Sequence, residues 1–236
     1  MLGAWLFGAA HAEPLTLAYA HRPGYADMIN GKPKGLSIEI AARAAKAANL
    51  DVSWALMVQP RQMAMLQRHV PNFCAIGLFK TPEREALGQF SNAYYRDRPY
   101  VVVVSRAAAR KVRGKASFAL LLRDSTLELG LLDSLSYGTK IDDMLKARGA
   151  VRRIEGKIEQ VFKMVASGRL DYTIASPEEV GPILDLAGIK RDEVEAVSYP
   201  DMPDGNLRYF LCSKAVEQAV MDRLNAGIAA LKLDLH

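Results

Sequence analysis

Short apolar segments alternate with amphipathic ones along the first third of the chain, and this order restricts the fold more than any other feature of the sequence. Apolar segments at 15–20, 52–58 and 72–78 predict strands, whereas apolar residues at helical spacing predict helices over 36–49 and 60–68. Parallel strands need a crossover between them, and a helix usually supplies it. The order strand–helix–strand therefore predicts a parallel sheet built from βαβ units.

A second series of the same kind follows the valine-rich run at 99–104, which is apolar and β-branched as strands are. The chain ends in a long amphipathic segment for which Ser213 is the expected N-cap. A length of 236 residues suits one large domain or two of about 100 residues each. Further strands are expected at 128–132, 151–155, 171–175 and 207–212, and further helices at 137–148, 158–165, 177–186 and beyond 213.

The charge of the chain is modest, with 31 Lys and Arg against 26 Asp and Glu and a formal net charge of +5. The basic residues are interspersed with acidic ones and form no run of four. We interpret this charge as a solubility feature that attracts anionic ligands weakly, and we expect no nucleic-acid partner.

Motifs for catalysis and for metal or cofactor binding are missing from the sequence. The four histidines are scattered and no two have the spacing of metal ligands. The sequence contains no Gly-x-Ser-x-Gly elbow, no phosphate-binding loop and no dinucleotide fingerprint. We therefore expect no catalytic residues, no metal and no cofactor.

The N-terminus carries a short apolar run, residues 2–10, followed by Ala10-His11-Ala12, the small-x-small pattern of a signal-peptidase site. We interpret residues 1–12 as the remainder of a signal peptide; the alternative is a buried N-terminal helix. No later apolar stretch approaches the length of about 20 residues that spans a bilayer, so we expect a soluble, exported protein. Export permits a disulfide. The two cysteines, Cys74 and Cys212, are either paired or separate buried thiols.

One segment concentrates the residues that favour ligand binding. After the strand that ends near Leu78, Thr81 is placed to cap a helix with Pro82 in its first turn. Arg84 then lies beside free backbone N–H groups and the positive end of the helix dipole, where an anion is stabilised. Its guanidinium adds bidentate geometry for a carboxylate. The alternative is a surface arginine that pairs with Glu83 or Glu85.

The stretch from Gly77 to Tyr95, with Thr81-Pro82-Glu83-Arg84, Phe90-Ser91 and Tyr94-Tyr95, resembles the hallmark segment of family 3 bacterial extracellular solute-binding proteins. These are the type II periplasmic binding proteins of polar amino-acid ABC importers. The segments 19–25, 35–39, 167–171 and 210–214 match the family in the expected order, and the likeness covers most of the chain.

The resemblance implies an α/β fold of two lobes that close like a Venus flytrap. Each lobe is expected to hold a mainly parallel sheet flanked by helices, and two hinge strands near 98–104 and 206–211 should join them. Residues 13–102 and 208–236 would form lobe 1, and residues 103–207 lobe 2.

The function implied by the resemblance is capture of a small anionic or zwitterionic organic ligand in the periplasm, by a monomer that passes it to an ABC permease or a receptor in the inner membrane. Two alternatives stay open. Some proteins of this fold are enzymes, such as periplasmic dehydratases, in which a carboxylate in the cleft acts as an acid or base. In this chain Glu178 is the candidate for that role. The same module also serves as a ligand-presenting sensor for a separate receptor.

The carboxylate-binding arginine of the family corresponds to Arg84, and the ligand-contacting loop of its second lobe to residues 134–138. Two departures narrow the ligand: Phe79 and Ser176 stand where relatives commonly carry groups that bind a ligand amine. Without a charged partner in a desolvated cleft, an α-ammonium group is disfavoured. We therefore expect a carboxylate that lacks this ammonium, an aromatic acid or a modified peptide. The expected ligand-binding residues are Arg84, Phe79, Gly77, Tyr25, Arg22, Arg61, Ser136, Tyr137 and Ser176.

Overall fold

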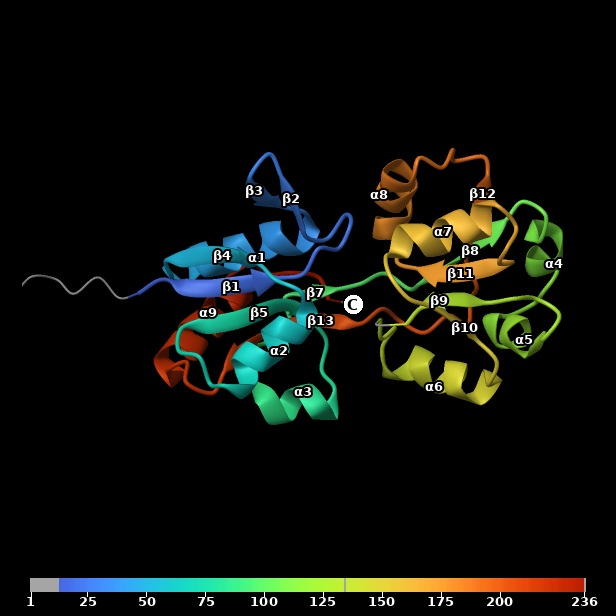
Figure 1. Ribbon diagram of the computed structural model, residues 1–236. Helices are drawn as coiled ribbons and strands as arrows, with labels where there is room; N and C mark the ends of the chain where they lie inside the picture. Colours follow the sequence, from blue (N-terminus) through green and yellow to red (C-terminus); the bar gives the residue numbers. More distant parts are fainter. Residues whose placement is uncertain (1–12, 134, 236) are drawn as a thin grey trace, which may run out of the picture.

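The computed structural model describes residues 13–133 and 135–235, and the predicted signal peptide, residues 1–12, lies outside them. The chain forms two α/β lobes that lie side by side and are joined by two crossing segments (Figure 1). The two-lobed fold expected from the sequence is confirmed. Among the described residues, no helix has the length and apolar character needed to cross a membrane.

The sheet of lobe 1 has a parallel core of three strands in the order β4-β1-β5, followed by the antiparallel strand β13 and then β6. Side chains of a strand alternate between its two faces. In β5, Cys74 and Ile76 accordingly face α1 and α9, whereas Phe73 and Ala75 face α2. The bounds are β1 Leu15–Tyr19, β4 Val52–Leu56, β5 Phe73–Leu78, β6 Gly88–Phe90, β13 Leu207–Ser213, α1 Leu36–Ala47, α2 Gln59–Gln67, α3 Pro82–Leu87 and α9 Gln218–Ala230.

Lobe 2 is built around β8, a run of four valines and a serine that is buried on both faces. Val102 and Val104 pack into one core, and Val101 and Val103 into the other. β8 runs antiparallel to both of its neighbours, β11 and β12, while β9 and β10 form a parallel pair beside β11. The bounds are β8 Val101–Ser105, β9 Gly130–Leu132, β10 Arg152–Ile154, β11 Tyr172–Ala175, β12 Val194–Val197, α4 Ala109–Arg113, α5 Phe118–Arg123, α6 Thr139–Arg148, α7 Ile158–Ala166 and α8 Pro177–Ala187.

Each lobe thus has one strand that runs against the others, and it is the strand that follows a crossing between the lobes. β8 follows the first crossing, and β13 follows the second. The crossing segments touch each other, because Asp97 N donates a hydrogen bond to Asn206 O at 2.9 Å. Arg96, in the short strand β7 (Tyr95–Arg96), donates to Leu235 O at 2.5 Å, so the end of the described chain lies at this hinge (Figure 1). The lobe limits at 102 and 207 stay predictions, and β8 pairs with lobe 2 from Val101 onward.

The two cysteines form a disulfide within lobe 1. Cys74 in β5 and Cys212 in β13 are direct partners in the antiparallel ladder, and both are fully buried. The bond joins residues 138 apart in sequence. It therefore links the part of lobe 1 that precedes lobe 2 with the part that follows it.

Two features of the fold differ from the sequence-based expectation. The C-terminal helix begins at Gln218 with Glu217 as its N-cap residue, so the prediction of Ser213 as the cap was wrong. Ser213 is the last residue of β13, and its Oγ accepts from Ala215 N in the turn that precedes the helix. The hairpin of β2 (Asp27–Ile29) and β3 (Lys32–Lys34) was not predicted, because strands of three residues are too short to show an apolar period.

Candidate functional site

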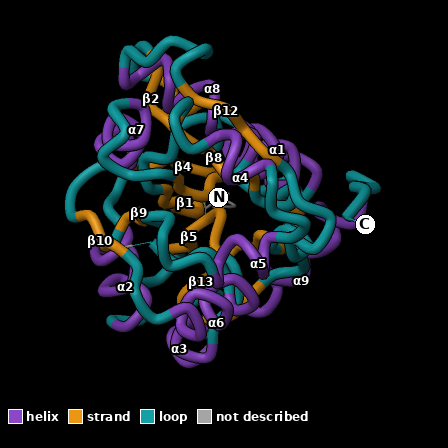
Figure 2. Tube along the Cα trace, turned by 90° about the vertical axis from the view of Figure 1, so that its right-hand side faces the viewer, coloured by secondary structure: helices purple, strands orange, loops and turns teal. Residues whose placement is uncertain are grey.

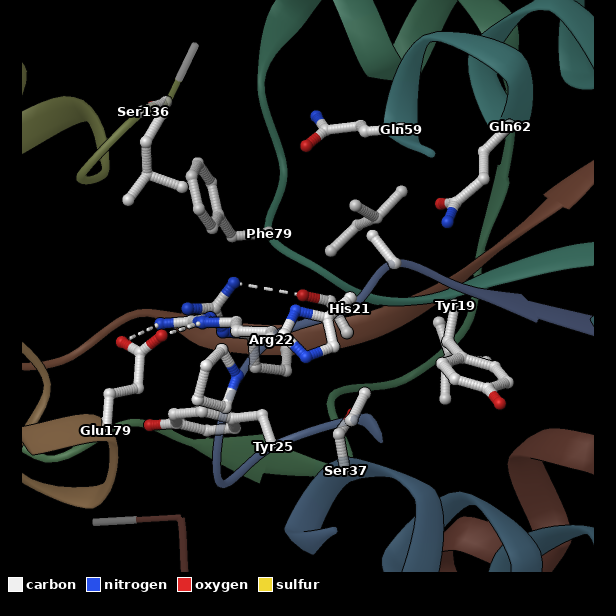
Figure 3. Close-up of a pocket in the computed structure, with 18 of the residues that line it drawn as sticks. Tyr19, His21, Arg22, Tyr25, Ser37, Gln59, Gln62, Phe79, Ser136 and Glu179 are labelled. Carbon is white, nitrogen blue, oxygen red and sulfur yellow. Dashed lines mark hydrogen bonds and ion pairs between the residues drawn. The ribbon is translucent and has the colours of Figure 1, made fainter. Parts of the chain in front are cut away.

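A cavity of about 170 Å³ lies between the lobes and is lined from both of them (Figure 3). Lobe 1 contributes the ends of β1 and β5, the loop after β1, and residues of α2 and α3. Seen from the side of lobe 2, α3 and α6 lie at the bottom of the molecule, whereas β2 and α8 lie at the top (Figure 2). Lobe 2 and the first crossing contribute Tyr100, Leu132, Leu135, Ser136, Ile158 and Glu179.

Arg84 lines this cavity from the first turn of α3. Thr81 caps the helix as the sequence predicts, since its Oγ1 accepts from Arg84 N at 3.3 Å. The guanidinium donates to Phe79 O at 2.8 Å and lies 4.6 Å from the centroid of the Phe79 ring. Burial, and then the nearby charge of Arg208, lower the pKa of Arg84 to about 10.

Within the described chain, no ion pair joins Arg84 to Glu83, to Glu85 or to any other carboxylate. Removal from water disfavours a charge that has no partner. An anion bound beside Arg84 would offset both the cost of removing the guanidinium from water and its repulsion from Arg208. This cleft therefore offers a guanidinium that forms no ion pair with a carboxylate of the described chain.

Arg208 is a cleft residue that the sequence did not predict. It lies in β13 and is 4% exposed, and its Nε donates to both oxygens of Asp97, at 3.0 and 2.8 Å. Its Nη2 also donates to Asp97, and its Nη1 donates to Gly77 O at 2.9 Å. One signal was available, because an arginine within an otherwise apolar strand needs a buried partner. Since Asp97 is in the first crossing segment, this ion pair also ties the two crossings together.

Arg22 binds Glu179 across the cleft with two parallel hydrogen bonds. Its Nε donates to Oε1 and its Nη2 to Oε2, both at 2.7 Å (Figure 3). Nη2 also donates to Ser176 Oγ at 3.3 Å, and the guanidinium lies 4.2 Å from the centroid of the Tyr25 ring. Burial alone would lower the pKa of Arg22, but the charge and hydrogen bonds of Glu179 raise it well above its ordinary value. The pair connects the loop after β1 in lobe 1 with α8 in lobe 2.

The structure brings together six of the nine residues expected to bind ligand. Arg84, Phe79, Gly77, Tyr25, Arg22 and Ser136 all line the cavity. Gly77 has a φ of +75°, in the left-handed region that favours glycine, and an added Cβ would lie 3.1 Å from Ser37 Oγ. Their contacts with a ligand stay predictions.

The other three expected residues do not line the cavity. Tyr137 is buried in the core of lobe 2, where its hydroxyl accepts from Leu132 N at 3.2 Å. Ser176 is fully buried behind Arg22. Arg61 is exposed on α2. The three arginines that meet at the cleft are therefore Arg22, Arg84 and Arg208, without Arg61.

Glu178, the carboxylate considered for acid–base work, lies outside the cavity lining. It accepts from Arg98 Nε at 2.6 Å and from the hydroxyls of Tyr25 and Tyr95 at 3.1 and 3.4 Å. Its role in the described structure is to hold α8 of lobe 2 against lobe 1. Among the residues that the structure describes, no three His, Cys, Asp or Glu side chains are grouped so that they could hold a metal ion.

Two α/β lobes, two crossing segments and a cleft lined from both sides define a two-lobed binding protein of the type II periplasmic class. Residues 17–235 match the model of the bacterial extracellular solute-binding proteins, family 3. The chain therefore belongs to this family, as the resemblance in the sequence predicted. No curated protein matches the chain.

Solved structures with low sequence identity share the fold. An arginine-specific periplasmic binding protein of Salmonella typhimurium has a TM-score of 0.65 and 20% identity, with 94% of each chain covered. A structure from work on glutathione import through GshT and a cystine ABC importer of Streptococcus mutans has a TM-score of 0.71 and 15% identity, with 93% of this chain and 90% of that one covered. The VFT2 domain of Bordetella pertussis BvgS has a TM-score of 0.69 and 15% identity, with 92% and 87% covered.

Proposed function

We propose that this protein captures a small carboxylate-bearing ligand in the cleft between its lobes, in the periplasm, and passes it to an ABC importer. The observation that carries the proposal is Arg84. It is largely removed from water, it lines the cavity, and no carboxylate of the described chain pairs with it. A ligand carboxylate supplies the missing partner with bidentate geometry.

The charges around the cavity favour the same ligand class. Three guanidinium groups, of Arg22, Arg84 and Arg208, face two carboxylates, of Glu179 and Asp97. Both carboxylates are held by arginines, so one positive charge is left over at Arg84. Phe79, Leu135 and Ile158 supply apolar surface beside it. An anion with an apolar or aromatic body is complementary to this lining.

Capture proceeds in two steps. The ligand binds first to Arg84 and the other groups of lobe 1, and lobe 2 then closes over it and contributes Ser136 and Leu135. Closure is a rigid-body rotation about the two crossing segments. Import is the expected outcome because solved structures of the same fold come from work on ABC transporters, among them a cystine importer and an amino acid transporter. The BvgS domain favours one second candidate, a module that presents the ligand to a receptor.

The test is a thermal-shift screen of the purified protein against aliphatic, aromatic and keto acids, each paired with its uncharged primary amide. We expect at least one acid to raise the unfolding temperature while its amide does not, because only the acid offers a carboxylate to Arg84. A pair in which acid and amide stabilise the protein equally would contradict the carboxylate assignment. The bound acid is then recovered and analysed after incubation: a binding protein returns it unchanged, whereas an enzyme of the same fold converts it.

A further inference from the structure

The acidic group of the cavity is already occupied by a side chain of the protein itself. Glu179 is the acidic residue among the described lining residues, and both of its oxygens accept hydrogen bonds of 2.7 Å from Arg22. The side chain of Glu179 is 9% exposed and that of Arg22 is 20% exposed, so little water reaches the pair.

The second carboxylate near the cavity is occupied in the same way. Asp97 is 2% exposed and accepts from Nε and Nη2 of Arg208. Glu178 lies outside the lining and is held by Arg98, Tyr25 and Tyr95. Among the described residues that line this cavity, no carboxylate is therefore available for a cation on the ligand, whereas the guanidinium of Arg84 is available for an anion.

We infer that Arg22 determines the ligand specificity of the cleft: it supplies from within the protein the positive group that would otherwise come from the ligand, so that the site takes monoanionic carboxylates and rejects α-amino acids. This inference rests on the proposed function, in which Arg84 holds the ligand carboxylate. An α-ammonium group brought into the closed cleft loses water, finds no charged acceptor and lies among guanidinium groups. Buried charged groups without partners are costly.

The contacts of Arg22 explain why a ligand ammonium does not displace it. Two parallel bonds to Glu179, a third bond to Ser176 and the ring of Tyr25 hold the guanidinium. A bidentate arginine–carboxylate pair is stronger and more directional than the contact of one ammonium. Arg22 lies three residues after the end of β1, so the sheet of lobe 1 positions it at the cleft.

The experiment compares ligand pairs that differ only in the amine, such as L-leucine with 4-methylpentanoate, L-phenylalanine with 3-phenylpropanoate and L-glutamine with 4-carbamoylbutanoate. Dissociation constants are measured by isothermal titration at about pH 8, where free carboxylates are ionised. The readout is the ratio of the constants within a pair. Arg22 and Glu179 also join the lobes, and a weaker closure changes both constants of a pair alike, so the ratio reports recognition alone.

The wild-type protein is expected to bind the acid of a pair at least about tenfold more tightly than the amino acid, as the loss of one charge-assisted bond implies. Arg22→Met frees Glu179, so the ratio should shift by about tenfold or more toward the amino acid. Arg22→Lys keeps the internal cation and should keep the wild-type preference. The double variant Arg22→Met with Glu179→Gln removes the freed acceptor and should lose the gain. If Arg22→Met does not fold, Glu179→Gln is measured instead: it leaves the Arg22 guanidinium without its carboxylate, so the ratio should shift further toward the acid, and an unchanged ratio would count against the inference.

Equal ratios for the wild type and Arg22→Met, or a wild type that prefers the amino acids, would overturn the inference. Failure of the proposed function has a different signature. In that case no acid binds, or the acids bind as tightly to Arg84→Ala as to the wild type, whatever the ratios are. If the acids bind through Arg84 but the ratio of dissociation constants is the same in the wild type and in Arg22→Met, the carboxylate function stands and the role inferred for Arg22 is wrong.

Discussion

At the scale of single residues, the hinge depends on one buried ion pair. Arg208 and Asp97 have side chains that are 5% and 1% exposed, and they join the two crossing segments. Removal of one partner of a buried pair leaves the other charge without compensation. The pair also fixes the position of the Arg208 guanidinium at the cavity.

We expect Asp97→Ala to lower the free energy of unfolding by about 3–5 kcal/mol, because Arg208 would stay buried and unpaired. Urea unfolding followed by circular dichroism measures the change. Asp185→Ala is the matched control: it breaks an exposed pair with Arg191, which contributes at most about 1 kcal/mol. Equal effects of the two substitutions would show that the buried hinge pair contributes no more to the free energy of unfolding than the exposed pair does.

At the scale of secondary-structure elements, much of the fold could be predicted from the sequence. The periods of the segments over 15–78 locate β1, α1, β4, α2 and β5 to within two residues, because each element buries one face or both. Thr81 and Pro82 identify the start of α3, because Thr81 caps the helix and the fixed φ of Pro82 suits its first turn. Elements of three residues, such as β2 and β3, escape prediction because they hold too few side chains to show a period.

The site was predictable only where a local signal marks it. Arg84 stands at a helix start, and it lines the cavity. The Arg22–Glu179 pair spans 157 residues of sequence, and no local pattern reveals such a distance. Tyr137 was expected at the cleft, but it fits a core position between Tyr100 and Leu132 instead. Residue types and spacing therefore locate an anchor, whereas the partners across the cleft come from the tertiary fold.

The disulfide between β5 and β13 gives a prediction at this scale. It closes a long loop that contains all of lobe 2, so its loss should increase the entropy of the unfolded chain. We expect the double variant Cys74→Ala with Cys212→Ala to be less stable by about 2–5 kcal/mol. Thermal unfolding with and without reductant measures this. Reductant should lower the midpoint of the wild type and leave that of the variant unchanged; an unchanged wild-type midpoint would contradict the role of the bond.

The second crossing segment gives another prediction. A Cβ at Gly205 would lie 1.8 Å from Asp97 O in the first crossing, a distance that no side chain tolerates. We expect Gly205→Ala to push the crossings apart and to lower the unfolding midpoint. Gly114→Ala serves as the control, since its Cβ would lie 3.3 Å from Arg110 O and φ there is −70°. A Gly205→Ala protein as stable as that control would show that the crossings do not pack as described.

At the scale of the whole molecule, α8 of lobe 2 holds the two lobes together. Its first turn carries Glu178 and Glu179, which between them bind four side chains of lobe 1 and the first crossing. The backbone also meets there, because a Cβ on Gly24 would lie 2.6 Å from Glu178 O. These contacts hold the two lobes against each other.

We therefore expect Glu178→Ala to open the ligand-free protein. The substitution removes the contacts to Arg98, Tyr25 and Tyr95, and small-angle X-ray scattering should report a larger radius of gyration than for the wild type. Glu193→Ala, at an exposed position beyond α8, should leave the radius unchanged. If Glu178→Ala leaves the radius unchanged too, the contacts at α8 do not set the closed state.

Arg84 is the proposed anchor of a ligand carboxylate in the cleft. Isothermal titration of the best acid from the screen into wild type, Arg84→Ala and Arg61→Ala tests it most directly. Arg61 is an exposed arginine outside the lining, so its loss removes the same charge without touching the cavity. We predict that Arg84→Ala weakens binding by at least about a hundredfold, as loss of a charge-assisted pair implies, while Arg61→Ala binds as the wild type does. An Arg84→Ala protein that folds and binds the acid with wild-type affinity would contradict the account.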